Sequence, residues 1–281
     1  MRWEEDRRST NIEDRRRRRV RNVVGGGIGS ILLVLAALYM GVDPSALLQK
    51  SGMQSQSAPT TQVEESPQEK KEVEFVSVVL ADTEDVWKNY FRQMGRRYVE
   101  PKLVLFRGAT QSACGHAQSA MGPFYCPADQ KVYIDLSFFD ELRRRYGASG
   151  DFAQAYIIAH EVGHHVQNLL GITEQAQRLQ ARSSRAQANA ISVRVELQAD
   201  CLAGVWANRA HKQKKILERG DIDEALNAAY VIGDDKLQKE AQGYVVPDSF
   251  THGSSKQRMS WFLRGLKSGD IDQCDTFAAL H

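Results

Sequence analysis

The chain has 281 residues, of which 42% are hydrophobic, and its formal net charge is +2. This length and hydrophobic content suffice for one sizeable folded domain with appended segments. The nearly balanced charge excludes a strong overall preference for nucleic acid.

Residues 1–22 are polar and basic, with nine arginines against five acidic residues. A run of arginines can bind nucleic acid, but it can also flank a membrane span on its cytoplasmic side. Residues 23–42 favour the second interpretation, because they form an uncharged, largely apolar run of twenty residues. Such a run spans a bilayer core of about 30 Å. We therefore expect an uncleaved transmembrane helix with the N-terminus inside the cell. A cleavable signal peptide is the alternative, although the run is long for one.

Residues 43–74 are rich in Ser, Gln, Pro, Glu and Lys and contain few large apolar side chains. This composition is typical of a flexible polar linker that does not fold alone. We expect the folded domain to cover residues 75–281, outside the cytoplasm and held away from the membrane by this linker.

The first part of that domain is predicted to contain both helices and strands. Residues 75–98 and 140–146 have the spacing of helices, whereas residues 102–106 and 132–138 alternate like strands. Residues 108–127 are expected to form a loop. Later helices are expected over residues 173–215, 221–232, 234–242 and 254–266.

The most informative stretch is an expected helix over residues 151–170. It contains the pattern H-E-x-x-H as His160, Glu161 and His164. Positions four apart share one face of a helix, so the two imidazoles can bind one ion while Glu161 lies beside a metal-bound water. Catalytic zinc takes three protein ligands and keeps its fourth position for that water. The alternative is a pair of hydrogen-bonded core histidines, because the motif also occurs by chance.

A third ligand has to come from another part of the chain. Glu196 and Asp200 lie four residues apart on a helical face that is otherwise apolar. We expect Glu196 to be the third zinc ligand and Asp200 to hold the outer nitrogen of a liganding histidine. The alternative is an exposed acidic edge that pairs with Arg194 and Arg209.

These two motifs resemble the gluzincin arrangement of zinc peptidases, in which H-E-x-x-H is followed by a second helix carrying Glu-x-x-Ala-Asp. More closely, the chain resembles a bacterial family called predicted neutral zinc metallopeptidases, whose members carry one N-terminal membrane anchor. The blocks that carry this resemblance extend over nearly the whole chain and include residues 1–3, 11–16, 220–228, 233–235 and 251–255.

The resemblance implies an α+β, mainly α fold of the zincin-like, minimal gluzincin type with a small sheet. It implies Zn²⁺ as cofactor, a peptide or protein substrate, and a single-pass location in the bacterial inner membrane with a periplasmic domain. Gluzincin-like enzymes bind substrate as a strand added beside the strand that precedes the H-E-x-x-H helix. In this chain that strand is expected over residues 132–138. They often use a late His, Tyr or Arg to stabilise the oxyanion. His252 is our candidate, with Arg258 and Tyr244 as competitors.

The chain has four cysteines, at Cys114, Cys126, Cys201 and Cys274. No two of them form a C-x-x-C pair, which argues against a second zinc site. Outside the cytoplasm, cysteines of this kind usually form disulfides. Three connectivities are open, and the simplest joins Cys114 to Cys126 and Cys201 to Cys274.

We therefore interpret the chain as a membrane-anchored zinc endopeptidase in which Glu161 activates a metal-bound water as general base. No nucleic-acid partner is expected. The rival hypothesis is a zinc-containing binding or chaperone-like envelope protein without catalytic activity. Cleavage of an unstructured protein such as casein separates the two.

Overall fold

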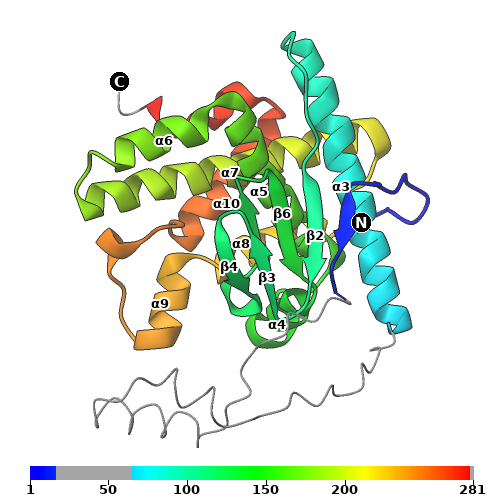
Figure 1. The fold of residues 1–281 in the computed structure, drawn as a ribbon, viewed down its shortest axis with the longest axis horizontal. Helices are drawn as coiled ribbons and strands as arrows, with labels where there is room; N and C mark the ends of the chain where they lie inside the picture. The colour runs from blue at the N-terminus through cyan, green and yellow to red at the C-terminus, as the bar shows by residue number, and fades with distance from the viewer. Residues whose placement is uncertain (17–64, 279–281) are drawn as a thin grey trace, which may run out of the picture. The chain divides into compact units, whose positions relative to one another are not determined.

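The computed structural model describes residues 1–16 and 65–278 of the chain. Helices predominate in these residues (Figure 1). In chain order the elements are β1 (Ile12–Asp14), α3 (Pro67–Gln93), β2 (Lys102–Phe106), β3 (Ala109–Ser112), β4 (Gly115–Gln118), η1 (Ser119–Met121), β5 (Phe124–Cys126), β6 (Lys131–Asp135), α4 (Ser137–Tyr146), α5 (Asp151–Leu170), α6 (Ile172–Gln180), α7 (Arg185–Lys214), α8 (Asp221–Val231), α9 (Asp234–Gln242), η2 (Pro247–Ser249), α10 (Ser255–Ser268) and η3 (Ile271–Cys274).

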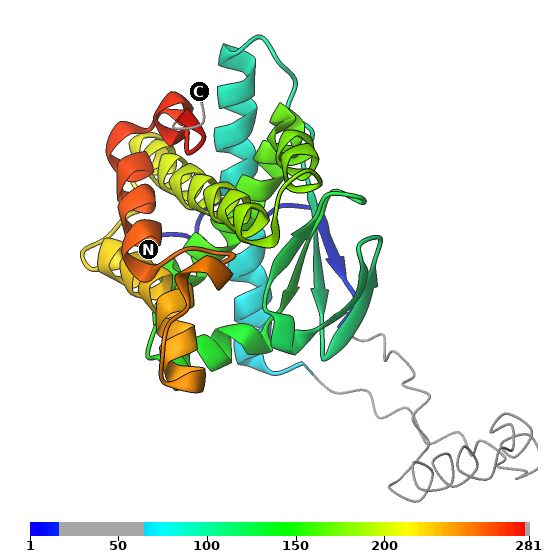
Figure 2. The same ribbon diagram turned by 90° about the vertical axis from the view of Figure 1, so that its left-hand side faces the viewer.

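The strands form one small sheet and one hairpin. The sheet has the order β1-β2-β6-β5, in which β1 and β6 run parallel to β2 and β5 runs antiparallel to β6. Strands β3 and β4 form a separate antiparallel pair. Most of the helices lie on one side of the sheet (Figure 2). The predicted α+β, mainly α class with a small sheet is thus confirmed.

Two predictions about the strands need correction. The expected loop over residues 108–127 contains the hairpin and the edge strand β5, because short strands of mixed polarity carry little periodic signal. The strand before the site helix, β6, lies between β2 and β5 and ends at Asp135. The Asp135 carboxylate accepts a hydrogen bond from the amide of Ser137, where α4 begins. Both edges of β6 are paired, so a substrate strand cannot be added there.

The core is built around α5, which packs against α3, α7 and α8. Phe152 of α5 stacks on Trp206 of α7 at a centroid distance of 6.0 Å, and both side chains are fully buried. Full burial of such a side chain contributes about 1.5–3 kcal/mol. Helices α7 and α10 approach very closely, because a Cβ on Gly204 would come within 2.1 Å of the Phe262 carbonyl oxygen. Helix α5 is therefore held in place by helices on several sides.

Residues 1–16 belong to the same folded unit as residues 65–278. Strand β1 pairs with β2, with Ile12 opposite Leu103. Trp3 is buried and packs edge-on against Phe75 of α3. These contacts differ from the predicted division, which set residues 1–22 apart as a basic cytoplasmic segment. Charge and composition show the arginines but do not reveal a strand of three residues that pairs with another strand far along the chain.

The linker boundary also differs, because α3 begins at Pro67 and not near residue 75. Ser66 caps this helix by accepting the Glu69 amide, and proline is well suited to a first helical turn. The polar first turns of α3 therefore resemble a linker in composition.

The predicted membrane span, residues 23–42, lies outside the described residues, as does most of the predicted linker. Within residues 1–16 and 65–278, none of the helices combines the length and the apolar character that a membrane crossing requires. A single crossing between residues 16 and 65 would separate β1 from β2 by a bilayer. The predicted topology, with the N-terminus inside and the domain outside, therefore conflicts with the packing of the N-terminal residues.

Both disulfides of the simplest predicted connectivity are present. Cys114 is bonded to Cys126, and Cys201 of α7 is bonded to Cys274 of η3. The first pair ties the β3–β4 hairpin to β5, and the second ties the C-terminal part of the chain to α7.

Candidate metal centre

Three potential metal ligands converge between α5 and α7. Nε2 of His160 lies 3.1 Å from Oε2 of Glu196, and Nε2 of His164 lies 3.4 Å from Oε1 of the same residue. One donor atom from each of the three residues lies within 4.8 Å of the others. Two imidazole nitrogens and a carboxylate are a typical donor set for catalytic zinc. The arrangement brings together the three residues predicted from the sequence.

Gly163 allows the two helices to approach at this point. A Cβ on this residue would lie 3.1 Å from the carbonyl oxygen of Ala199 on α7, a very tight contact. The glycine stands directly before His164, so the backbone of α7 can pack close to the face of α5 that carries the histidines. Glu196, one turn before Ala199, is thereby brought opposite both rings.

The outer nitrogen of His160 is held by Asp200. Nδ1 of His160 lies 2.8 Å from Oδ1 of Asp200, whose side chain has no exposed surface. The same carboxylate accepts hydrogen bonds from Tyr156 Oη at 2.5 Å and from Nε of Arg258 at 2.9 Å. An ionised carboxylate only accepts hydrogen bonds, so Nδ1 of His160 carries a proton, and Nε2 is the nitrogen that can lose its proton and bind a metal ion.

These contacts exclude the exposed acidic edge as an explanation for the two carboxylates. Asp200 is fully buried, and the Glu196 side chain is only 20% exposed. Arg209, one of the two proposed surface partners, instead donates to the carbonyl oxygen of Gly269 at 2.7 Å.

Charge compensation sets the protonation of this group. Burial alone would raise the pKa of Asp200, but Arg258 and His160 outweigh it and hold the pKa at about 2. Burial would lower the pKa of His160, but Asp200 and Glu196 outweigh it and raise the pKa to about 10 in the metal-free protein. A metal ion binding to His160 therefore has to displace a proton.

Glu161 follows His160 on α5 and is also buried, at 8% exposure. Burial raises the pKa of its carboxyl above the usual value, and the neighbouring His160 and His164 oppose this rise. A carboxylate with a raised pKa next to a metal site is a suitable proton acceptor.

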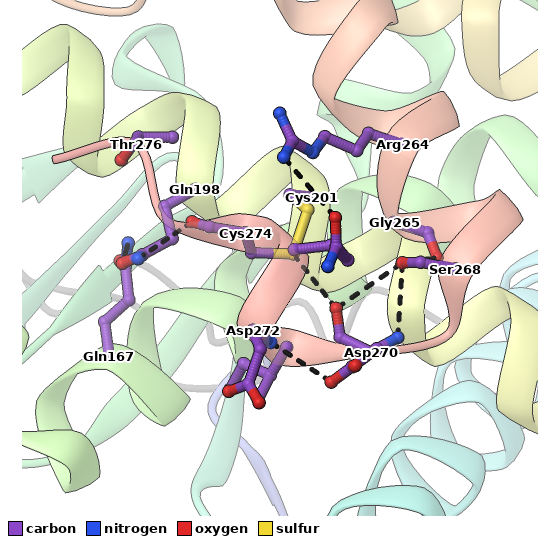
Figure 3. The surroundings of a disulfide bond; sticks show 12 residues. Gln167, Gln198, Cys201, Arg264, Gly265, Ser268, Asp270, Asp272, Cys274 and Thr276 are labelled. Carbon is purple, nitrogen blue, oxygen red and sulfur yellow. Dashed lines mark hydrogen bonds between the residues drawn. A yellow bond between two sulfur atoms is a disulfide. The ribbon is translucent and has the colours of Figure 1, made fainter. Parts of the chain in front are cut away.

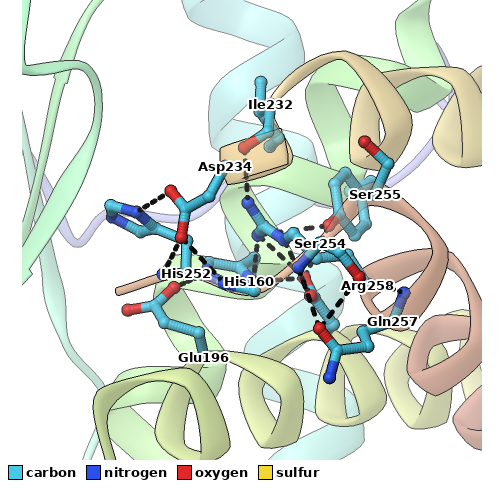
Figure 4. A network of polar contacts seen from close by, with 12 residues as sticks. His160, Glu196, Ile232, Asp234, His252, Ser254, Ser255, Gln257 and Arg258 are labelled. Carbon is cyan, nitrogen blue, oxygen red and sulfur yellow. Dashed lines mark hydrogen bonds and ion pairs between the residues drawn. The ribbon is translucent and has the colours of Figure 1, made fainter. Parts of the chain in front are cut away.

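His252 lies in the loop before α10, and Asp234 holds it in place. Its Nδ1 is 3.1 Å from Oδ1 of Asp234, while Oδ2 of Asp234 accepts the backbone amides of Thr251, His252 and Gly253. The ring remains 53% exposed. The hydrogen bond to Asp234 raises the pKa of His252, and the charge of Glu196 adds to the effect. Figure 4 shows the ring near Glu196. His252 is thus a partly exposed side chain near the centre, and Asp234 favours its protonated form.

The two competitors of His252 are placed differently. Arg258 lies behind His160, with Nη2 3.5 Å from Nδ1 of that ring, and its side chain is only 4% exposed. Tyr244 is 62% exposed, just beyond the end of α9. Arg258 is therefore part of the support of the centre, a role that its sequence position did not indicate. Tyr156 precedes His160 by four residues, so helical spacing alone could have suggested that it shares this face.

His165 does not take part in the centre. Its Nε2 lies 2.6 Å from the carbonyl oxygen of Val99, and its Nδ1 lies 3.0 Å from Tyr125 Oη. Burial lowers the pKa of His165 to about 4, so the ring is neutral near pH 7. It packs β5 against α5.

A second cluster of carboxylates, Asp151, Asp221 and Glu224, also has donor atoms within 4.8 Å of one another. The ammonium group of Met1 lies 2.6 Å from Oδ1 of Asp151 and 3.4 Å from Oδ1 of Asp221. This cluster therefore already holds a positive charge and differs from the centre between α5 and α7.

Comparisons with known proteins identify a family and several relatives of this chain. The model of a family described as "Putative neutral zinc metallopeptidase" matches residues 1–277. The uncharacterized protein YpfJ of Escherichia coli K12 is 52% identical over 287 residues, covering 99% of each chain. The uncharacterized protein Rv2575 of Mycobacterium tuberculosis is 39% identical over 256 residues, covering 86% of this chain and 85% of its own. No solved structure gives a significant match.

Proposed function

Because the chain belongs to the neutral zinc metallopeptidase family and its cofactor is Zn²⁺, we propose that it is a zinc-dependent endopeptidase. We assign His160, His164 and Glu196 as the zinc ligands. The observation that carries this assignment is the convergence of their donor atoms within 4.8 Å, with Nδ1 of each histidine engaged on its outer side. Both rings are thereby left in the tautomer that binds a metal through Nε2.

The roles of the other residues follow from their positions. Zinc, when bound, supplies a Lewis acid and lowers the pKa of a bound water to about 7. Glu161 would accept a proton from the attacking water as general base and pass it to the leaving amine. His252 donates a hydrogen bond to the oxyanion, and Asp234 holds the imidazole ring for this purpose.

The substrate lies beside β5 in this proposal. Within residues 1–16 and 65–278, β5 pairs only with β6, so its other edge can accept a peptide strand. Tyr125 of β5 also contacts His165 and Asn168 of the site helix, which places the strand next to the ligand His164. Backbone hydrogen bonds along such an edge bind unfolded segments with little regard to sequence.

The two disulfides support a location outside the cytoplasm for the folded unit, because disulfides persist in oxidising compartments. In this proposal residues 1–16 lie on the same side of the membrane as residues 65–278. Attachment to the membrane through residues 23–42 stays a prediction from the sequence.

Two variants of the complete chain test the activity, since residues 1–16 are part of the fold. Glu161→Gln keeps the shape of the side chain but cannot accept the proton, so it should bind one zinc and fail to cleave casein. Glu196→Ala should lose stoichiometric zinc and cleavage together. Glu174→Gln on the surface of α6 is the matched control and should behave as wild type.

Cleavage by Glu161→Gln at a rate near that of wild type would refute the mechanism. Full zinc occupancy in Glu196→Ala would mean that Glu196 is not the third ligand. If the zinc-loaded wild-type protein cleaves none of a set of unfolded proteins, the rival hypothesis of a zinc-containing binding protein is favoured.

A further inference from the structure

The outer nitrogen of His164 has a partner of a different kind from that of His160. Nδ1 of His164 lies 2.8 Å from Oε1 of Gln167, one turn later on α5. Gln167 is fully buried, and its Nε2 donates to the carbonyl oxygen of Val195 at 2.7 Å and to Oε1 of Gln198 at 2.9 Å. Gln198 is buried as well and donates through Nε2 to the carbonyl oxygen of Cys274 at 3.0 Å (Figure 3).

Two backbone carbonyl groups determine which atom donates in each of these hydrogen bonds. A backbone carbonyl can only accept, so Val195 and Cys274 each require an amide nitrogen of the glutamine that they contact. Gln198 must then present its oxygen to Gln167, and Gln167 must present its own oxygen to His164. His164 consequently carries a proton on Nδ1, and Nε2 is left as the nitrogen that can bind a metal ion.

We propose that Gln167 is a positioning residue that sets the tautomer and orientation of the His164 ring, and that Gln198 and the carbonyl of Cys274 hold Gln167 in the required rotamer. This inference rests on the proposed metal centre. Gln167 is not one of the proposed ligands, and its effect on the centre runs through its hydrogen bond to His164.

The last acceptor in this series of hydrogen bonds is the carbonyl of Cys274, which is joined to Cys201 by a disulfide. Val195, Gln198 and Cys201 all belong to α7, so the disulfide fixes the Cys274 carbonyl relative to the helix that carries the other acceptor. The C-terminal part of the chain thereby contributes to the geometry of a ligand that lies more than one hundred residues earlier in the sequence.

The binding of Co²⁺, a spectroscopic substitute for zinc, tests this role without any measurement of activity. In the complete protein, Gln167→Met keeps a similar volume but removes the acceptor, so it should bind Co²⁺ about 10- to 100-fold more weakly and with a changed visible spectrum. Gln167→Glu keeps an oxygen opposite Nδ1 but loses the donation to the Val195 carbonyl, so it should recover part of the affinity. Gln198→Met should give a smaller loss, because Val195 still holds Gln167.

Gln180→Met is the matched control. Gln180 of α6 also donates to a carbonyl, that of Ala188, and to a side-chain oxygen, that of Ser192, but it does not touch a proposed ligand. It should bind Co²⁺ as wild type does. Thermal unfolding of the metal-free proteins checks that each variant is folded.

Co²⁺ affinity and spectrum of Gln167→Met equal to those of wild type would overturn the role of Gln167, and so would an equal loss in Gln180→Met. Failure of the metal centre itself gives another result: Glu196→Ala would then bind Co²⁺ as wild type does, or wild type would bind none.

Discussion

Asp200 lies 2.8 Å from Nδ1 of His160 and has no surface exposed to solvent. The same carboxylate receives two hydrogen bonds from the guanidinium group of Arg258. Asp200 thus connects a proposed zinc ligand with a buried positive charge, and its removal should affect both the metal and the fold.

Asp200→Asn should weaken zinc binding by about 10- to 100-fold, because the partner of a liganding histidine loses its charge. It should also lower the free energy of unfolding by about 3–5 kcal/mol, because Arg258 is left buried without its counter-ion. Chelator competition and urea unfolding measure the two effects, with the exposed Asp248→Asn as control. Unchanged zinc affinity would contradict the assigned role of Asp200.

His252→Ala should lower kcat by about 10²- to 10³-fold, which is the usual effect of removing one oxyanion donor. Its zinc content and stability should remain near those of wild type, because the side chain is half exposed and is not a ligand. Tyr244→Phe, at the exposed competitor, should leave kcat unchanged. If His252→Ala retains the wild-type kcat, another residue stabilises the oxyanion.

Residues 1–16 and 65–278 should lie on the same side of the membrane. All four native cysteines are in disulfides, so a new thiol at exposed Thr10 or Lys239 can be labelled selectively. Thr10→Cys and Lys239→Cys should both react with an impermeant maleimide in intact cells. If one reacts in intact cells and the other only after lysis, a single membrane crossing separates the two parts and β1 cannot pair with β2.

The two disulfides should stabilise the fold unequally. Cys201 and Cys274 are separated by 73 positions and Cys114 and Cys126 by 12. In the chain-entropy model these loops correspond to about 4 and about 3 kcal/mol. Urea unfolding of the two double alanine variants measures the difference. A larger loss for the shorter loop would show that local packing, and not loop closure, dominates.

Asp82 should make a contribution to stability that increases toward acid pH. Burial raises its pKa to about 6, although the partner Lys214 acts in the opposite direction. Since the folded pKa lies above the unfolded value of 3.8, the folded state binds the extra proton as the pH falls through about 6. The contribution is complete below the unfolded pKa and is lost as the pH rises through the folded pKa.

Asp82→Asn removes this titration. Between pH 8 and pH 4, the free energy of unfolding of wild type should gain about 2 kcal/mol relative to the variant. Urea unfolding of both proteins at several pH values gives this difference. A difference that is independent of pH would mean that Asp82 has an ordinary pKa in the folded protein.

The sequence by itself was sufficient to predict the convergence of His160, Glu161 and His164, because helical spacing is a local property that needs no knowledge of the fold. The same argument placed Glu196 and Asp200 on one face of a second helix. The fold class and both disulfide pairs were also predicted, the latter from the simplest connectivity.

Only the tertiary structure decided which groups support these residues. Helical spacing cannot predict which carboxylate Arg258 pairs with. It also does not reveal that Gln167 and Gln198 are hydrogen-bonded to each other and each donate to a backbone carbonyl. Strand β1 has three residues and is completed by β2, about ninety positions later. Pairing at this separation depends on the packing of Trp3 and its neighbours against α3, which composition does not report. The arginines near the N-terminus therefore suggested a separate segment, whereas residues 1–16 belong to the folded unit that holds the candidate metal centre.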